Sequence, residues 1–286
     1  MKVLLAMGTR PEVIKMQSIY HRLKSDSFFD PIICFTGQHM ELCEPLFKFF
    51  KLTIHHSLAL MEKGQTLSQL ASKTLSSMPA VLSSEQPDLV LVQGDTTTAL
   101  TVALSAFHEQ IPVGHVEAGL RTGDLAAPFP EEGNRSLISR IAKFHFAPTE
   151  LAKSLLNKEN ILKNVYVTGN TVIDSLIQTK QRVGEGINDL QDIGVDGDFV
   201  LVTIHRRESF GNPLIRICNA IKRLSKVYNK FNFVIPVHPN PNVNVVVHQI
   251  LGGLENIKLI DPLPYAEFVY LMARCRLLLT DSGGIQ

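Results

Sequence analysis

Short apolar runs alternate with longer amphipathic segments along the whole chain. The runs are rich in Val, Ile and Leu and are apolar on both faces, which is typical of strands buried inside a parallel sheet. They predict strands over residues 3–7, 31–36, 89–92, 113–116, 199–204, 231–237 and 277–280. Residues 96–108 and 213–227 carry apolar stripes of helical period. The alternation of strands with helices predicts a doubly wound α/β fold.

The pattern weakens over residues 178–198, which are polar and contain glycines, and a new series of strands begins at Phe199. A chain of 286 residues is long enough for two domains. We therefore place the junction between about residues 170 and 198. The expected parts are an N-terminal Rossmann-like domain over residues 1–172, which carries the acid/base groups, and a C-terminal Rossmann-like domain over residues 173–286, which binds a nucleotide.

Polar residues follow the expected strands. Open α/β sheets bind ligands at the carboxyl ends of their strands, so these positions are the candidate site. They are residues 8–12, 37–39, 94–98, 117–121, 168–170, 205–208, 238–241 and 281–284. Loops from both domains are expected to direct charged groups toward one cleft.

Each of these positions also has a structural interpretation. Asp95 precedes a predicted helix, where Asp is a favoured N-cap. Glu131 and Glu132 stand at another helix start, where carboxylates favour the helix dipole with or without a catalytic role. Residues 206–208 are compatible with a solvated ion-pair cluster. The small residues 282–284 are compatible with a plain tight turn, or with a turn that presents N–H groups to a phosphate.

Composition excludes several classes of protein. Lys and Arg number 28 against 27 Asp and Glu, without a block of like charge, so nucleic acid is not an expected partner. No apolar run is long enough for a membrane span or a signal peptide, and the four widely spaced cysteines favour a reducing compartment, so we expect a cytoplasmic protein. The histidines form no HExxH motif or His/Cys cluster, so no metal site is expected. The first turn, residues 8–11, lacks GxGxxG, which disfavours a nicotinamide dehydrogenase.

Together these motifs resemble one family, the non-hydrolysing UDP-N-acetylglucosamine 2-epimerases of bacteria. The resemblance rests on residues 8–12 with Lys15, 94–98, 112–124 (PVGHVEAGLRTGD), 128–135, 168–174, 205–211 and 280–286 (TDSGGIQ). It implies two Rossmann-like lobes with parallel sheets and a central cleft, the GT-B type of α/β fold. Family chains continue past SGGIQ, so we expect an incomplete second lobe with exposed apolar surface and a broken nucleotide pocket.

The resemblance also implies an activity without a cofactor: interconversion of UDP-N-acetylglucosamine and UDP-N-acetylmannosamine through elimination and re-addition of UDP, which supplies surface polysaccharide precursors. The implied catalytic residues are Asp95, Glu117 and Glu131 as acid/base groups, in roles left open, and His205 beside the diphosphate. The implied substrate-binding residues are Arg10, Lys15, Leu263, Phe268, Ser282, Gly283 and Gly284, with Leu263 and Phe268 at the uracil. A second substrate molecule, bound as an activator, would lie near Gln38, Arg206, Arg207 and His238. A homodimer is implied as well.

Three alternatives stay open at this point. A hydrolysing 2-epimerase would admit water and release N-acetylmannosamine and UDP. The chain could be a truncated fragment that binds the sugar nucleotide without catalysis. A GT-B glycosyltransferase is weakened because Asp95, Glu117 and Glu131 are more acid/base groups than a simple transfer requires.

Overall fold

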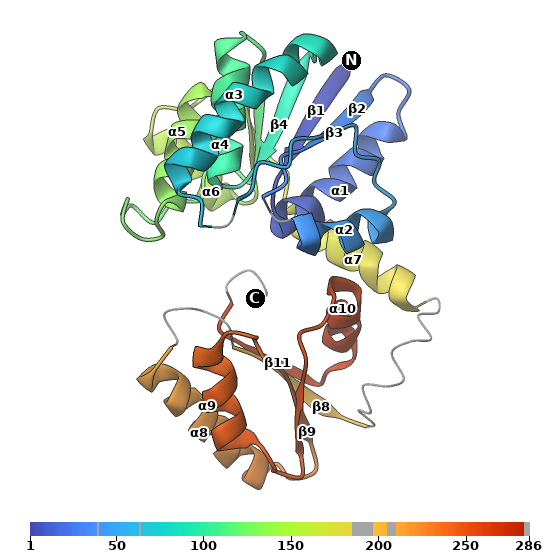
Figure 1. The fold of residues 1–286 in the computed structure, drawn as a ribbon, viewed down its shortest axis with the longest axis vertical. Helices are drawn as coiled ribbons and strands as arrows, with labels where there is room; N and C mark the ends of the chain where they lie inside the picture. Colours follow the sequence, from blue (N-terminus) through green and yellow to red (C-terminus); the bar gives the residue numbers. More distant parts are fainter. Residues whose placement is uncertain (39, 63, 185–196, 205–209, 283–286) are drawn as a thin grey trace. The chain divides into compact units, whose positions relative to one another are not determined.

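The computed structural model describes residues 1–38, 40–62, 64–184, 197–204 and 210–282. The chain separates into two compact units, Met1–Ser175 and Leu176–Gln286, and each is described by itself (Figure 1). This boundary and the junction expected between residues 172 and 173 lie in the same helix, α7 (Thr171–Gly184). The division of chemistry between the two domains stays a prediction.

The first unit is built on a parallel sheet of seven strands within the described residues. The strands are β1 (Lys2–Met7), β2 (Asp30–Phe35), β3 (His56–Ser57), β4 (Leu89–Gln93), β5 (Val113–Val116), β6 (Phe144–Ala147) and β7 (Val165–Val167). Their order is β3-β2-β1-β4-β5-β6-β7, and every neighbouring pair is parallel. The chain reverses its winding direction between β1 and β4, where open α/β sheets form their ligand crevice.

Helices cover both faces of this sheet (Figure 1). They are α1 (Arg10–Lys24), α2 (Met40–Phe50), α3 (Leu67–Glu85), α4 (Thr97–His108), α5 (Glu131–Ile141), α6 (Glu150–Lys158) and the first part of α7. Apolar side chains of α3, α4 and α5 form one core with Leu4, Val90, Val92 and Val113 of the strands. Helix α1 packs against β1, β2 and β4 with its buried residues Val13 and Met16.

The second unit carries a parallel sheet of four described strands in the order β10-β9-β8-β11. The strands are β8 (Phe199–Thr203), β9 (Asn232–Pro236), β10 (Ile257–Ile260) and β11 (Leu277–Thr280). Helices α8 (Asn212–Val227) and α9 (Pro241–Leu251) belong to the core on one face, and α10 (Tyr265–Arg274) to the core on the other. The two parallel sheets confirm the predicted α/β class with two Rossmann-like lobes.

All seven expected strands and both expected helices are present, with bounds shifted by at most one residue. Strands β3, β6, β7 and β10 were not expected, because they are very short or interrupted by a polar residue such as His145 or Lys258. The interpretation of Asp95 as a helix N-cap is wrong. Thr96 caps α4, since its side chain accepts a hydrogen bond from the Ala99 N–H.

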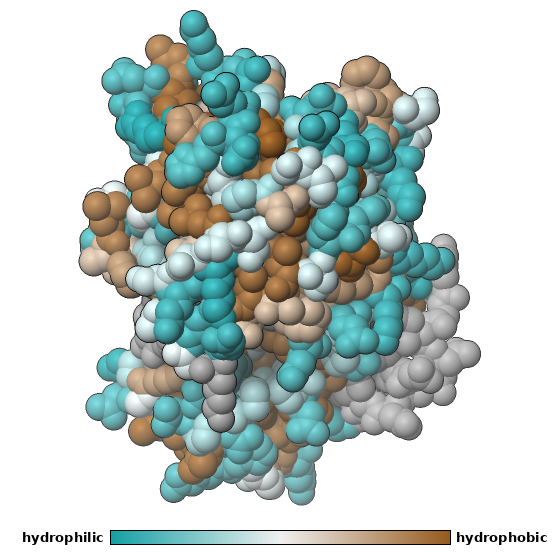
Figure 2. Space-filling model, turned by 45° about the horizontal axis from the view of Figure 1, so that its top comes forward, coloured by the Kyte–Doolittle hydropathy of each residue, from teal (hydrophilic) through white to brown (hydrophobic). Residues whose placement is uncertain are grey.

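The surface mixes hydrophilic and hydrophobic residues on the face shown in Figure 2. Large apolar side chains are exposed on both units, among them Phe129 (71%) and Val227 (72%). In the described part of the chain, no helix combines the length and apolar character needed to cross a membrane.

Gly119, in the loop that follows β5, lies against α6 and leaves no room for a side chain. Its φ is +89°, and a Cβ built there would lie 2.4 Å from the Ala152 carbonyl oxygen of α6. Gly123 in the same loop has a similar φ of +81°, but a Cβ there would meet nothing within 4 Å. A substitution at Gly123 therefore measures the free-energy cost of a side chain in the left-handed conformation, and a substitution at Gly119 measures that cost together with a steric clash.

We predict that Gly123→Ala lowers the free energy of unfolding by about 1 kcal/mol, the cost of placing Ala at positive φ. Gly119→Ala should cost about 3 kcal/mol or more, because α6 must also move away. Urea unfolding followed by circular dichroism measures both values. Equal losses in the two variants would show that the loop does not press against Ala152.

Candidate active site

Glu117 is the centre of a polar cluster at the carboxyl ends of the first sheet's strands. It directly follows β5, and its side chain is 11% exposed. Its Oε2 accepts hydrogen bonds from Lys15 Nζ at 2.6 Å and from the Gln93 side-chain amide, while its Oε1 accepts one from Asn170 Nδ2 at 2.8 Å. Three donors from α1, β4 and the turn before α7 thus compensate one half-buried carboxylate.

The backbone at Glu117 adopts an uncommon conformation. Its φ is +66°, in the left-handed region that non-glycine residues rarely occupy. The surrounding backbone holds it there, because the Ala118 N–H donates to the Phe146 carbonyl at 3.0 Å and Val116 accepts from the Gly94 N–H at 3.0 Å. Strained residues of this kind concentrate at functional sites, which supports a functional role for Glu117.

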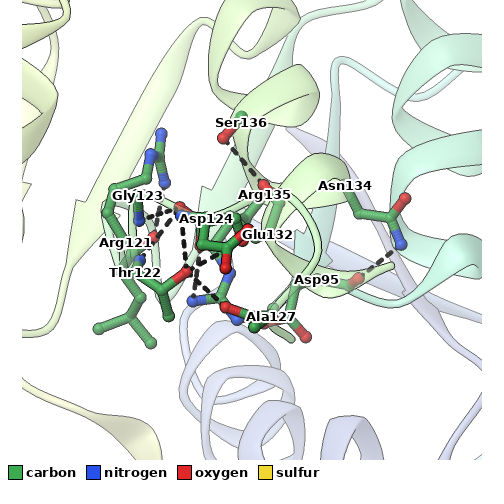
Figure 3. A network of polar contacts seen from close by, with 12 residues as sticks. Asp95, Arg121, Thr122, Gly123, Asp124, Ala127, Glu132, Asn134, Arg135 and Ser136 are labelled. Carbon is green, nitrogen blue, oxygen red and sulfur yellow. Dashed lines mark hydrogen bonds and ion pairs between the residues drawn. The ribbon is translucent and has the colours of Figure 1, made fainter. Parts of the chain in front are cut away.

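Asp95 lies in the turn between β4 and α4 and is held by α5 (Figure 3). Its Oδ2 accepts from Arg135 Nη2 at 2.6 Å, and its main-chain carbonyl accepts from Asn134 Nδ2 at 2.8 Å. Burial raises the pKa of Asp95, the Arg135 charge lowers it, and the charges of Glu117 and Glu131 raise it. The three predicted acid/base residues are therefore close enough to influence one another electrostatically.

The paired glutamates at the start of α5 have different environments. Glu131 is half-buried, whereas Glu132 is buried and its Oε1 accepts the N–H groups of Thr122 and Gly123, both at 3.0 Å (Figure 3). Burial raises the pKa of Glu132, but these two hydrogen bonds and the Arg135 charge lower it by more, so that the net pKa is below its usual value. Glu132 fastens the loop after β5 to α5, and a role for Glu131 in proton transfer stays a prediction.

Glu12 is a further buried carboxylate, which lies in the candidate range 8–12 but received no role of its own from the sequence. It accepts the N–H groups of Gly8 and Thr9, both at 2.7 Å, and the Thr96 hydroxyl at 2.6 Å. Burial raises its pKa, although these hydrogen bonds act in the opposite direction. Glu12 joins the turn after β1 to the turn after β4. The signal in the sequence is the T-x-x-E spacing of a capping box, from Thr9 to Glu12.

His115 supports the Asp95 turn from β5. It is buried, and its Nε2 lies 2.8 Å from the Gly94 carbonyl oxygen. A carbonyl only accepts, so Nε2 carries the proton. Burial lowers the pKa of His115 to about 4, the Gly94 hydrogen bond acts against this, and His145, Arg121 and Arg135 lower the pKa further. His115 is therefore neutral at physiological pH.

The residues predicted to bind the nucleotide are spread over both units. Arg10 is exposed at the start of α1, and Lys15 contacts Glu117. Leu263, which precedes α10, and Phe268, which belongs to it, are half-buried against the core on that face of the sheet. The Ser282 N–H donates to Thr280 Oγ1 at 3.0 Å. His205, Gly283 and Gly284 lie outside the described residues. A role for any of them stays a prediction.

The residues predicted for a second substrate molecule are only partly described. Gln38 accepts from the Thr98 hydroxyl at 2.9 Å and lies at the edge of an open depression of about 370 Å³. His238 is exposed, and its Nδ1 accepts from the Asn240 N–H at 3.1 Å. Arg206 and Arg207 lie outside the described residues. The depression is also lined by Gly37, Met40, Glu41, Leu42, Ala59 and Met61.

The geometry of the first unit suits proton transfer. Lys15 forms an ion pair with Glu117 and Arg135 forms one with Asp95, and the charges of Glu117 and Glu131 both act on Asp95. Within the described residues, no group of three or more His, Cys, Asp or Glu side chains has an arrangement that could hold a metal ion. Fold and site thus define an α/β protein of two Rossmann-like lobes, the first of which carries a cluster of carboxyl groups near the carboxyl ends of its strands.

Comparison with known proteins identifies the family. Residues 21–286 match the family model described as UDP-N-acetylglucosamine 2-epimerase. The chain is 45% identical to the UDP-N-acetylglucosamine 2-epimerase of Escherichia coli K12 over 294 residues, which cover 100% of this chain and 78% of that protein. The corresponding protein of Neisseria meningitidis is 42% identical, with 100% and 79% covered.

Solved structures agree with this assignment. The Neisseria meningitidis UDP-GlcNAc 2-epimerase bound to UDP-GlcNAc has a TM-score of 0.91 at 41% identity and matches 100% of this chain and 79% of its own. The Methanocaldococcus jannaschii enzyme in complex with UDP-GlcNAc and UDP has a TM-score of 0.83 at 34% identity, with 100% and 80% matched. The chain belongs to the UDP-N-acetylglucosamine 2-epimerase family, and the GT-B type of α/β fold is confirmed.

We predict that neutral His115 makes stability depend on pH. In the unfolded chain this residue becomes protonated below about pH 6.5, whereas in the folded chain it becomes protonated only near pH 4. Between these values the unfolded state binds more protons, so stability falls as pH falls, by about 3 kcal/mol in all.

The difference in free energy of unfolding between wild type and His115→Gln isolates this residue, because Gln does not titrate. Urea titrations from pH 7.5 to pH 4 should show wild type losing about 3 kcal/mol relative to the variant. Parallel curves for the two proteins would show that His115 is not buried in its neutral form.

Proposed function

We propose that this protein interconverts UDP-N-acetylglucosamine and UDP-N-acetylmannosamine by inverting carbon 2 of the sugar. The observation that carries the proposal is the cluster of Asp95 and Glu117, which follow β4 and β5, with Glu131 at the start of α5. The named activity of the relatives and the sugar nucleotide bound to the Neisseria meningitidis structure support it.

The proposed reaction needs no net oxidation or reduction. A base removes the proton from carbon 2, the electron pair of that bond forms a double bond between carbons 1 and 2, and the bond from carbon 1 to the UDP oxygen breaks. The reverse steps return UDP to carbon 1 and deliver a proton to the opposite face of carbon 2. This chemistry requires proton-transfer groups near carbon 2 and cationic or N–H donors near the diphosphate.

The three carboxyl groups differ in what they can supply. Glu117 receives three N–H donors on its two oxygens, so both oxygens act as acceptors in this arrangement, as those of a general base must. Burial raises the pKa of Asp95, which brings it closer to the protonated form that a proton donor needs. Glu131 is half-buried beside them and can exchange protons with water. We therefore propose Glu117 as the base in one direction, with Asp95 or Glu131 supplying the proton on the other face.

The departing diphosphate would meet cationic groups at the start of α1. Arg10 is exposed there, and Lys15 lies one turn further along and contacts Glu117. We propose His205, Ser282, Gly283 and Gly284 as further diphosphate contacts, and Leu263 and Phe268 at the uracil. A hydrolysing reaction would instead consume water, and the relatives named as epimerases favour inversion without hydrolysis. The homodimer and the cytoplasmic location stay predictions, which sedimentation and cell fractionation would test.

Incubation with UDP-N-acetylglucosamine in heavy water should yield a UDP-sugar of manno configuration with deuterium at carbon 2. Proton NMR of the reaction mixture measures both changes in one sample. Release of free N-acetylmannosamine and UDP would select the hydrolysing reaction. A sugar nucleotide that keeps its configuration and its proton at carbon 2 would overturn the proposed function.

Neutral variants of the three acid/base residues should lower kcat. We expect kcat to fall about 10²- to 10⁴-fold in each of the variants Asp95→Asn, Glu117→Gln and Glu131→Gln, because a general acid or base usually accelerates a reaction by a factor of this size. Glu109→Gln is the matched control, because Glu109 is an exposed carboxylate that follows the last residue of α4, at the end of the sheet opposite the strand ends that carry Asp95 and Glu117. Its kcat should equal that of wild type. A wild-type kcat in any of the three variants would remove that residue from the chemistry.

A further inference from the structure

The turn that carries Asp95 is held by hydrogen bonds to its backbone. The Gly94 carbonyl accepts from His115 Nε2 at 2.8 Å, the Gly94 N–H donates to the Val116 carbonyl at 3.0 Å, and the Asp95 carbonyl accepts from Asn134 Nδ2 at 2.8 Å. His115 belongs to β5, the strand paired with β4, and its backbone is in register with Val92. Two of the three hydrogen bonds therefore come from one neighbouring strand.

Gly94 needs such support. Its φ is +73°, and a residue without a Cβ imposes little preference of its own on the peptide that leads into Asp95. The direction of the Gly94 carbonyl decides how the Gly94–Asp95 peptide plane is turned. A donor on a fully buried ring, anchored in a strand, holds that plane more rigidly than a mobile surface group would.

We propose that His115 is a positioning residue, which orients the Asp95 carboxyl group for proton transfer through its hydrogen bond to the Gly94 carbonyl. The proposal rests on the proposed function. His115 contacts the turn rather than the substrate, so it is distinct from the three carboxyl groups. Arg135 then holds the Asp95 side chain from the other side, at 2.6 Å.

The surroundings of His115 assign it a fixed protonation state. A second proton would go to Nδ1, which has no hydrogen-bond partner among the described residues. The groups that bear on this ring are His145 of β6, Arg121 of the loop after β5 and Arg135 of α5, and all three oppose a positive charge. His115 is therefore a permanent N–H donor and does not shuttle protons during the reaction.

The test compares substitutions that keep or remove the donor. The amide nitrogen of His115→Gln can take the place of Nε2, whereas His115→Asn is too short to reach Gly94 and His115→Leu has no donor. His145→Leu is the matched control, because His145 is also buried and is paired in register with His115, while the Gly94 contact belongs to His115 alone among the described histidines. Two readouts are needed: kcat and KM for epimerisation, and hydrogen exchange of the backbone amides from Gly94 to Thr97.

We expect kcat to fall about 10- to 100-fold in His115→Leu and His115→Asn with KM within about threefold, because a misplaced group slows chemistry more than binding. Amide exchange in the turn should be about tenfold faster in both. His115→Gln should restore both readouts, and His145→Leu should keep the wild-type kcat even where it lowers stability.

A wild-type kcat in His115→Leu and His115→Asn, a loss in His115→Gln as large as in His115→Leu, or an equal loss in His145→Leu would overturn the proposal. If wild type leaves UDP-N-acetylglucosamine unchanged, it is the proposed function that fails. The exchange rates then decide by themselves whether His115 holds the turn, and unchanged exchange in His115→Leu would show that it does not.

Discussion

A half-buried carboxylate must be compensated, and at Glu117 this requirement organises the first lobe's site. Its two oxygens take donors from Lys15, Gln93 and Asn170, which lie on separate segments of the chain. Gln93 ends β4, α1 follows β1, and the turn with Asn170 follows β7. These strands belong to one parallel sheet, so the three donors meet only once the sheet has formed. Removing one of the three donors would leave this carboxylate only partly compensated, which lowers stability. The left-handed backbone of Glu117 is maintained by the main-chain hydrogen bonds of its neighbours Val116 and Ala118.

Chemically similar side chains take different roles here because their partners differ. Glu12 and Glu132 each accept two backbone N–H groups, those of Gly8 and Thr9 in the turn after β1 and those of Thr122 and Gly123 in the loop after β5, and so hold these segments in place. Asp95 and Glu117 are compensated by side-chain cations and amides that could rearrange when a substrate arrives. Backbone donors belong to the fold and cannot leave, whereas side-chain donors can change partners. This distinction separates the structural carboxylates from those suited to proton transfer.

The sequence predicts the fold well wherever a strand is buried on both faces. Runs such as residues 3–7 and 113–116 contain mainly apolar residues and coincide with strands. Strand β6 was missed because it contains His145 and, unlike the run 113–116, no Val, Ile or Leu, and β3 because two residues carry no periodicity. The strand ends predicted where Asp95 and Glu117 lie, and the catalytic role of Asp95, Glu117 and Glu131 stays a prediction. The resemblance named Glu131 rather than Glu132, but residue patterns alone did not show the structural role of Glu132, since only the folded loop reveals that it accepts the Thr122 and Gly123 N–H groups.

The central claim is that the carboxyl cluster of the first lobe performs the chemistry at carbon 2 of the sugar. A crystal structure of the Asp95→Asn variant with UDP-N-acetylglucosamine tests it most directly, because this substitution preserves the shape of the site while slowing turnover. The account predicts that carbon 2 lies within about 3.5 Å of the Glu117 or Glu131 carboxyl group or of the Asn at position 95, as near-attack geometry requires. A sugar ring bound with carbon 2 beyond reach of all three would contradict it.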